Sequence, residues 1–174
     1  MRGISPVREG MREEDVRLLH GLLTRQRIMT LAVLVDGAPN ASVVPYALRP
    51  DGSAAIIQAS RLSAHTKGLT EGAPFSVAVH EADRPEADPL QIVRMTLDGR
   101  VRVIERDTPA FAEADALLCR RFPAAAMTLS LGDFGLYELR FERGRLVGGF
   151  ARASNVTKDT LAALAKMMAA AQLP

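Results

Sequence analysis

A group of hydroxyl, imidazole and ammonium side chains follows the third expected strand of this 174-residue chain. Its members are Ser60, Ser63, His65, Thr66 and Lys67. The pattern from residue 63 onward is that of a short helix, and the unpaired backbone N–H groups at a helix start attract anions. Hydroxyls, amides and an ammonium are donors that suit a phosphate. The sequence therefore predicts a phosphate site at the rim of a sheet.

A structural interpretation of the same residues stays open, in which Ser63 caps the short helix and Lys67 faces solvent. Under the phosphate interpretation, Arg94 or Thr96 supplies a further contact from the long strand expected over residues 92–105.

Pro45 interrupts the strand expected over residues 40–48. Proline removes a hydrogen-bond donor from the ladder, so this position belongs at a sheet edge, at a bulge or opposite a ligand. Two interpretations fit Val43, Val44, Pro45 and Tyr46 equally. Either the strand kinks locally with a half-buried tyrosine, or its backbone opens against a flat ligand.

Several strands and helices must position these groups. Further strands are expected over residues 28–35, 54–59 and 75–80, with a final hairpin of 134–141 and 145–150. Helices are expected over 11–27, 63–71, 108–122 and 156–172. Antiparallel neighbours dominate, and the G-x-G-x-x-G turn of a Rossmann fold is missing. The pattern predicts a mainly β, α+β fold, namely a small antiparallel barrel decorated by helices.

Composition narrows the class of protein. Apolar residues make up 48% of the chain and charged residues 24%, with a net charge of +2. We expect a single domain over residues 1–174 with a loose arm at 1–10, and no binding to nucleic acid. No signal core or membrane span is evident, so a cytoplasmic protein is expected. The histidines His20, His65 and His80 match no zinc signature, so no metal site is expected.

Four segments together resemble a known superfamily. They read ASVVPYALRPDG, SRLSAHTKGL, DPLQIVRMTLDGRV and GDFGLYELRFERGRLVGGFARA. They are similar to the FMN-binding split barrels of the pyridoxamine 5′-phosphate oxidase type, and especially to the branch related to heme-utilisation proteins. The resemblance covers about residues 15–155.

The resemblance implies a six-stranded split barrel that forms a homodimer, with FMN at the subunit interface. Basic and hydroxyl residues would hold the flavin phosphate, and the strand containing Pro45 would border the ring. The implied cofactor residues are Val43, Val44, Pro45, Tyr46, Ser60, His65, Thr66, Lys67, Arg94 and Thr96. Phe150 and Arg152 would reach the flavin of the partner. Gly68 departs from the asparagine that the family often has there.

Two functions follow from the resemblance. The first is a flavin-dependent oxidoreductase acting on a small organic substrate, with no assignable catalytic residue and with the deazaflavin F420 as an alternative to FMN. It ranks first because heme-utilisation relatives usually carry a further C-terminal domain, whereas this sequence ends at Pro174. The alternative is a heme-binding or heme-utilisation protein without flavin turnover, with His65 or His80 as the axial ligand.

Overall fold

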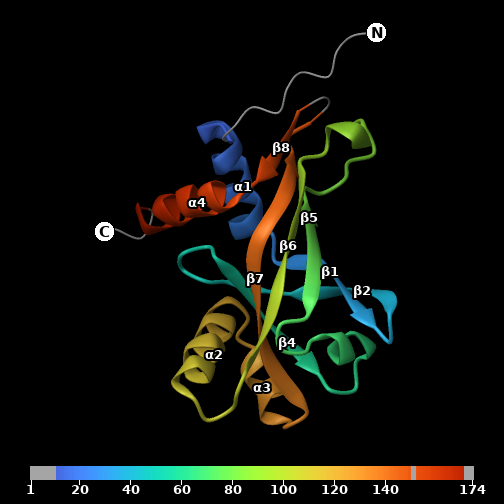
Figure 1. Ribbon diagram of the computed structural model, residues 1–174, viewed down its shortest axis with the longest axis vertical. Coiled ribbons are helices and arrows are strands. Elements are labelled where there is room, and N and C mark those ends of the chain that lie inside the picture. Colours follow the sequence, from blue (N-terminus) through green and yellow to red (C-terminus); the bar gives the residue numbers. More distant parts are fainter. Residues whose placement is uncertain (1–10, 150–151, 171–174) are drawn as a thin grey trace.

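The computed structural model describes residues 11–149 and 152–170 (Figure 1). The helices are α1 (Glu13–Arg25), α2 (Pro109–Arg121), α3 (Ala125–Ser130) and α4 (Lys158–Ala170), with short 3₁₀ helices η1 (Ala64–Gly68) and η2 (Pro89–Gln91). The strands are β1 (Ile28–Val35), β2 (Ala38–Pro45), β3 (Ala47–Leu48), β4 (Ala54–Ser60), β5 (Pro74–His80), β6 (Arg94–Ile104), β7 (Phe134–Val147) and β8 (Ala153–Val156).

Local sequence explains where several elements begin and turn. Asp36 and Gly37 both have positive φ, 52° and 79°, which is the backbone of the tight turn that joins β1 to β2. Thr108 caps α2 by accepting a hydrogen bond from the Phe111 N–H at 3.2 Å, with proline at the first helical position. Thr157 caps α4 in the same way, through the Thr160 N–H.

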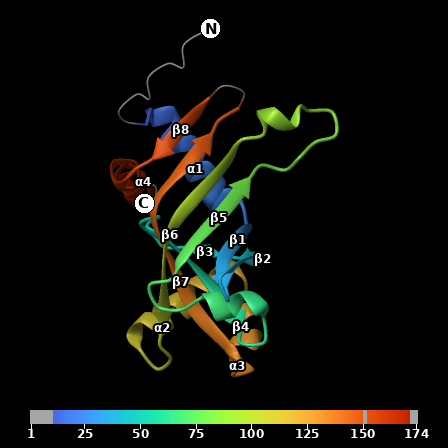
Figure 2. The ribbon, with the colours of Figure 1, turned by 45° about the vertical axis from the view of Figure 1, so that its right-hand side comes forward.

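All strand pairs are antiparallel, in the order β2-β1-β5-β6-β7-β4-β3, and β8 pairs with the end of β7. The two ends of this order, β2 and β3, are consecutive segments that only Tyr46 separates. The strand made of β2 and β3 therefore leaves β1 and joins β4, which closes the sheet on itself (Figure 2). With these two segments taken as one, the barrel has the six strands that the sequence predicts, and β8 extends it.

The core fills the barrel and continues beneath α1 and α4. Alternate residues of β1 (Met29, Leu31 and Val33) point inward and are buried, as the period of a strand requires. Leu19, Leu22 and Leu23 of α1 cover one end of this core. A second apolar cluster lies between α2, α3 and the outer side of β4 and β7.

The expected hairpin at residues 134–150 is wrong. β7 runs without a turn from Phe134 to Val147. Gly144 does not have the positive φ of a tight turn. Instead it allows close contact with β6, since a Cβ on it would lie 2.2 Å from the Thr96 carbonyl oxygen. Gly144 therefore allows the backbones of β6 and β7 to approach each other closely, and it does not reverse the chain.

Other element boundaries differ less from the sequence predictions. The helix expected over 63–71 is only the 3₁₀ turn η1, and α3 and β8 were not predicted. The predicted bend of the long strand at Gly99 is confirmed, since the β6–β7 register shifts between Asp98 and Gly99. The arm at 1–10 and the last two residues expected in the C-terminal helix lie outside the described residues. Within the described ranges, no helix is long and apolar enough to cross a membrane.

Candidate functional site

The predicted phosphate cluster is assembled at the end of β4, but the protein itself occupies the hydroxyls of Ser60 and Thr66. Ser60 donates to the Asp133 carboxylate at 2.5 Å, and Thr66 donates to the Ser60 carbonyl at 2.6 Å. Asp133 also places a negative charge beside the cluster, which opposes anion binding. Ser63 precedes η1 without capping it through its side chain, so the capping interpretation is wrong. Phosphate binding here stays a prediction that depends on Lys67, which is exposed.

His65 differs from the other members of the cluster. Its Nε2 is buried, and no group among the described residues bonds to it. Burial lowers the pKa of His65 below its ordinary value, because desolvation disfavours the charged ring. The neighbouring Gly68 packs tightly against β1, because a Cβ there would lie 2.6 Å from the Leu34 carbonyl oxygen. The backbone position therefore has no room for the asparagine of related sequences.

The segment 43–46 lies at the junction of β2 and β3. Val43 points outward and is exposed, whereas Val44 is buried in the core. Pro45 ends β2, which pairs only with β1, so its expected place at a sheet edge is confirmed. Tyr46 is fully buried, and its hydroxyl donates to the Leu23 carbonyl at 2.8 Å. The prediction of a half-buried tyrosine is therefore wrong. The ring of Tyr46 fills the core, and its hydroxyl anchors α1 to the barrel.

Tyr46 should give the fold a measurable alkaline instability. Burial raises the pKa of Tyr46 to about 12, against an opposing effect of Arg121. A raised pKa means that stability is complete below pH 10 and is lost as the pH rises toward 12. Between pH 8 and pH 11 the wild type should lose about 1.4 kcal/mol of unfolding free energy more than Tyr46→Phe. Urea denaturation of both proteins at the two pH values measures this difference, and equal losses would contradict it.

Arg94 and Thr96 lie away from the Ser60–Lys67 cluster, at the other end of the barrel (Figures 1 and 2). They point outward from β6, and register pairs them with other outward residues. One row contains His80, Arg94 and Val147, and the next contains Ala78, Thr96 and Arg145. Residues directly opposite each other in antiparallel strands share a face. The outer faces of β5, β6 and β7 therefore bring these side chains together.

A cavity of about 410 Å³ opens over these two rows. Pro89, Leu90 and Ile92 from the loop between β5 and β6 form its other wall. Arg94 donates to the Ile92 carbonyl at 3.1 Å, and Arg145 donates to the Asn155 side chain at 3.1 Å. The cavity is thus apolar over much of its surface, with two guanidinium groups and one imidazole. We call it the outer cavity.

The imidazole of His80 is oriented by the backbone. Its Nδ1 lies 2.6 Å from the Glu81 carbonyl oxygen, which can only accept a hydrogen bond. Nδ1 must therefore carry the proton, and in the neutral ring the free lone pair is on Nε2. A backbone carbonyl that fixes the tautomer in this way is the common arrangement around metal-binding histidines.

Sequence reasoning found some of these residues and missed others. Arg94, Thr96 and His80 were named as candidates, but Arg145 and the apolar wall were not. The alternation of outward residues in β7 would have indicated Arg145, had the segment been taken as one strand. Arg152, expected near a partner's flavin, instead forms an ion pair with buried Asp15 of α1. Phe150 lies outside the described residues.

Comparison with known proteins agrees with the curled antiparallel sheet. Residues 17–148 match the family model of pyridoxamine 5′-phosphate oxidase. The chain belongs to this family. The same match confirms the resemblance expected from the sequence, and the closed six-strand arrangement confirms the split-barrel fold.

The relatives of this family member include heme proteins. Heme oxygenase HutZ of Vibrio cholerae is 28% identical over 138 residues, which cover 79% of this chain and 77% of HutZ. The heme binding protein of Mycobacterium smegmatis is 31% identical in structural alignment, with a TM-score of 0.75, covering 88% of this chain and 62% of that one. A crystal structure of HutZ, described as the heme storage protein, has a TM-score of 0.64 at 24% identity, covering 76% of this chain and 92% of HutZ, and shows the shared fold.

These relatives overturn the first functional expectation. We expected a flavin-dependent oxidoreductase, but HutZ and the mycobacterial relative described above are named for heme and not for a flavin. The family also includes flavin enzymes, so membership in it does not determine which cofactor the protein binds.

Proposed function

We propose that this protein binds heme in the outer cavity and takes part in heme utilisation. The observation that carries the proposal is His80, which lines an apolar cavity with its Nδ1 proton committed to the backbone. Imidazole is a common axial ligand of heme iron. Iron held in this way can bind small gases or exchange electrons, and the protein tunes this chemistry through the ligand and its surroundings.

The remaining residues of the outer cavity fit a porphyrin. Leu90, Ile92 and Val147 offer apolar surface to the macrocycle. Arg94 and Arg145 are exposed cations whose planar guanidinium groups can pair with the propionate carboxylates.

The names of the relatives support heme binding, but they do not extend the proposal for this chain to heme degradation. HutZ is named a heme oxygenase, and the mycobacterial relative is named a heme binding protein. This chain spans 62% of the length of the mycobacterial protein. Binding is therefore the function that we propose, and any heme-degrading activity of the whole protein is a further proposal.

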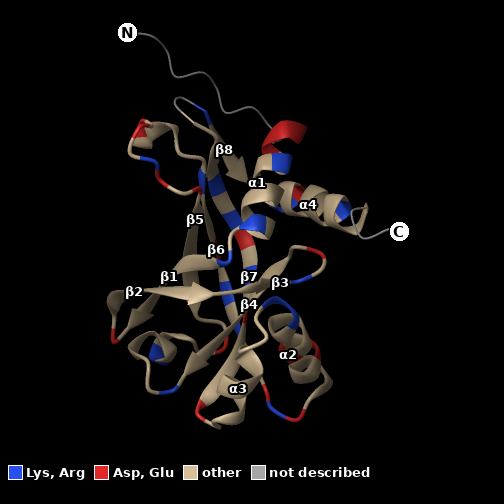
Figure 3. Cartoon of the chain, turned by 180° about the vertical axis from the view of Figure 1, so that it is seen from behind, with Lys and Arg blue, Asp and Glu red and all other residues tan. Residues whose placement is uncertain are grey.

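We also propose that the protein forms a homodimer through β1 and β2. The outward side chains Ile28, Leu34 and Val43 are 56%, 52% and 64% exposed. Neither strand carries a charged residue, as Figure 3 shows from behind. Large exposed apolar faces usually mark interfaces. Register continues this face from Val43 through Thr30 and Ala78 to Thr96, so a partner seated on it would border the outer cavity.

Titration with hemin tests the proposed binding. We expect a saturable Soret band with one hemin per chain. Arg94→Ala should weaken binding roughly tenfold, because it removes one charge-assisted hydrogen bond. Arg143→Ala is the matched control, since Arg143 is exposed and pairs with Asp98 instead of lining the cavity. Light scattering on the same samples measures the oligomeric state.

Parallel titrations with FMN and F420 decide between the cofactors. If either flavin binds more tightly than hemin, or if hemin binding does not saturate at one per chain, the proposed function is wrong. A monomer that binds hemin normally would contradict the dimer alone.

A further inference from the structure

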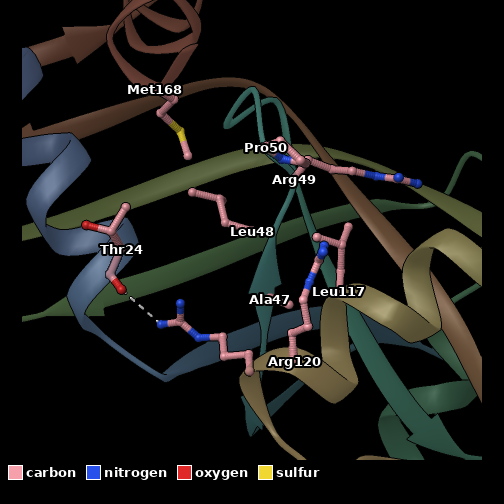
Figure 4. Close-up of a pocket in the computed structure, with 9 residues that line it drawn as sticks. Thr24, Ala47, Leu48, Arg49, Pro50, Leu117, Arg120 and Met168 are labelled. Carbon is pink, nitrogen blue, oxygen red and sulfur yellow. Dashed lines mark hydrogen bonds between the residues drawn. The ribbon is translucent and has the colours of Figure 1, made fainter. Parts of the chain in front are cut away.

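A second cavity, distinct from the outer cavity, lies where α1, α2 and α4 approach β3 (Figure 4). Its volume is about 490 Å³. Leu48, Leu117 and Met168 supply apolar surface from three different elements. It shares no lining residue with the outer cavity. We call it the helix cavity.

The charge around the helix cavity is one-sided. Three arginines line it, and none of its lining residues is acidic. Arg49 is neutralised by Glu138, with its Nε 2.7 Å from the carboxylate, and in Figure 4 it extends away from Leu48 and Met168. Arg120 is exposed, and no described residue pairs with its guanidinium. The cavity therefore keeps an excess of positive charge.

Arg121 has a buried hydrogen-bond donor that is left without an acceptor. Its Nη2 donates to the Thr24 carbonyl at 3.0 Å, shown by the dashed line in Figure 4, and to the Gln26 carbonyl. Its Nε is buried, and no acceptor for it exists among the described residues. A buried charged donor without an acceptor is unusual in a folded protein.

The walls of the helix cavity are held in place independently of any ligand. Gly52, in the turn after Pro50, has a φ of 70°, and a Cβ on it would lie 2.5 Å from the Met168 sulfur. The turn and α4 are thus in close contact. Arg121 fastens α2 to the end of α1 through the carbonyl bonds described above. A cavity between elements that are fixed to one another is preformed for a ligand.

We propose that the helix cavity binds an organic carboxylate with an apolar chain. Arg120 and Arg121 receive the carboxylate, because planar guanidinium groups match its two oxygens. The chain packs against Leu48, Leu117 and Met168. A ligand with a hydroxyl in place of the carboxylate lacks the ionic contact with the arginines. A carboxylate without an apolar chain lacks the packing against Leu48, Leu117 and Met168.

Decanoate is a suitable probe, and methionine methyl groups report where it binds. In the full-length protein labelled with ¹³C-methyl methionine, decanoate should shift the Met168 signal, which Met168→Leu assigns. Met95 lines the outer cavity and Met127 is exposed on α3, so both should stay unchanged. Decanol and acetate should each bind at least roughly tenfold more weakly than decanoate.

Arg120→Gln should weaken decanoate binding roughly tenfold, while Arg17→Gln on α1 should leave it unchanged. Arg17 is a matched control because it is exposed and, within the part of the chain that the structure describes, pairs only with Glu13. Equal affinities for decanoate and decanol would overturn the proposal without any variant. Shifts at Met95 before Met168, or an Arg120→Gln protein that binds normally, would overturn it as well.

Discussion

Replacing His80 by alanine should abolish the spectrum of histidine-ligated heme and weaken hemin binding by at least roughly a hundredfold. Losing a partner of a metal ligand typically costs ten- to a hundredfold in affinity, and losing the ligand itself costs more. His80 is exposed at the end of β5, and among the described residues its side chain bonds only to the Glu81 carbonyl. The variant should therefore fold as the wild type does. Hemin titration followed by absorption and resonance Raman spectra measures both effects.

Two other histidines provide the controls. His20 lies on α1 and His65 on η1, and neither lines the outer cavity. Their alanine variants should keep the wild-type spectrum. Added imidazole should restore a six-coordinate or histidine-like spectrum to His80→Gly, because the small ring can occupy the vacated space. If His65→Ala loses the band and His80→Ala keeps it, the heme lies at the η1 end of the barrel and the outer cavity is not the site.

Replacing Gly99 by alanine should destabilise the protein by more than about 4 kcal/mol. A Cβ at this position would lie 1.7 Å from the Arg140 carbonyl oxygen and 2.8 Å from its carbon. Both atoms belong to the backbone of the paired strand, so no rotamer change relieves the clash. The strands would have to separate at the point where their register shifts. Chemical denaturation compares the free energy of unfolding with that of the wild type.

Gly37→Ala provides the contrast for this prediction. Gly37 has a φ of 79°, but nothing lies within 4 Å of a Cβ placed there. Its cost is backbone strain alone, about 1 kcal/mol. If both variants lose similar stability, the close approach of β6 to β7 is not what limits residue 99.

Periodicity predicted most of the barrel. β1 matches its expected range of 28–35, because eight apolar and β-favouring residues end at an Asp-Gly turn. β6 follows from strict alternation, and its irregularity follows from the glycine within it. The hairpin at 134–150 failed because Glu142, Arg143 and Gly144 form a plausible turn locally. Only pairing along the whole of β6 makes that segment continue as a strand, and such a long-range effect is not encoded in a short window.

The candidate site was less accessible to sequence reasoning. Hydroxyls near a helix start predict an anion site, but the carboxylate of Asp133 that binds Ser60 is 73 residues away in the chain. His80 and Arg145 are brought together through β6, which neither neighbours in sequence. The residue types in the sequence indicated which residues could bind a cofactor. Strand register determined which of them share a face.

The order of strand pairing also has a consequence for how the chain folds. The strands β1 to β4 form one set of consecutive antiparallel strands, and β5 to β7 form another, with α2 and α3 between β6 and β7. The two sets meet only along β1–β5 and β4–β7, and the latter pairs Ser60 with Phe134 and Ala54 with Arg140. Each pair within a set closes a shorter loop than either junction does, so the junctions carry a higher entropic cost. We expect each half to form early and their docking to limit the folding rate. The segment 61–73 is then a tether whose main kinetic role is to keep the halves at a high local concentration.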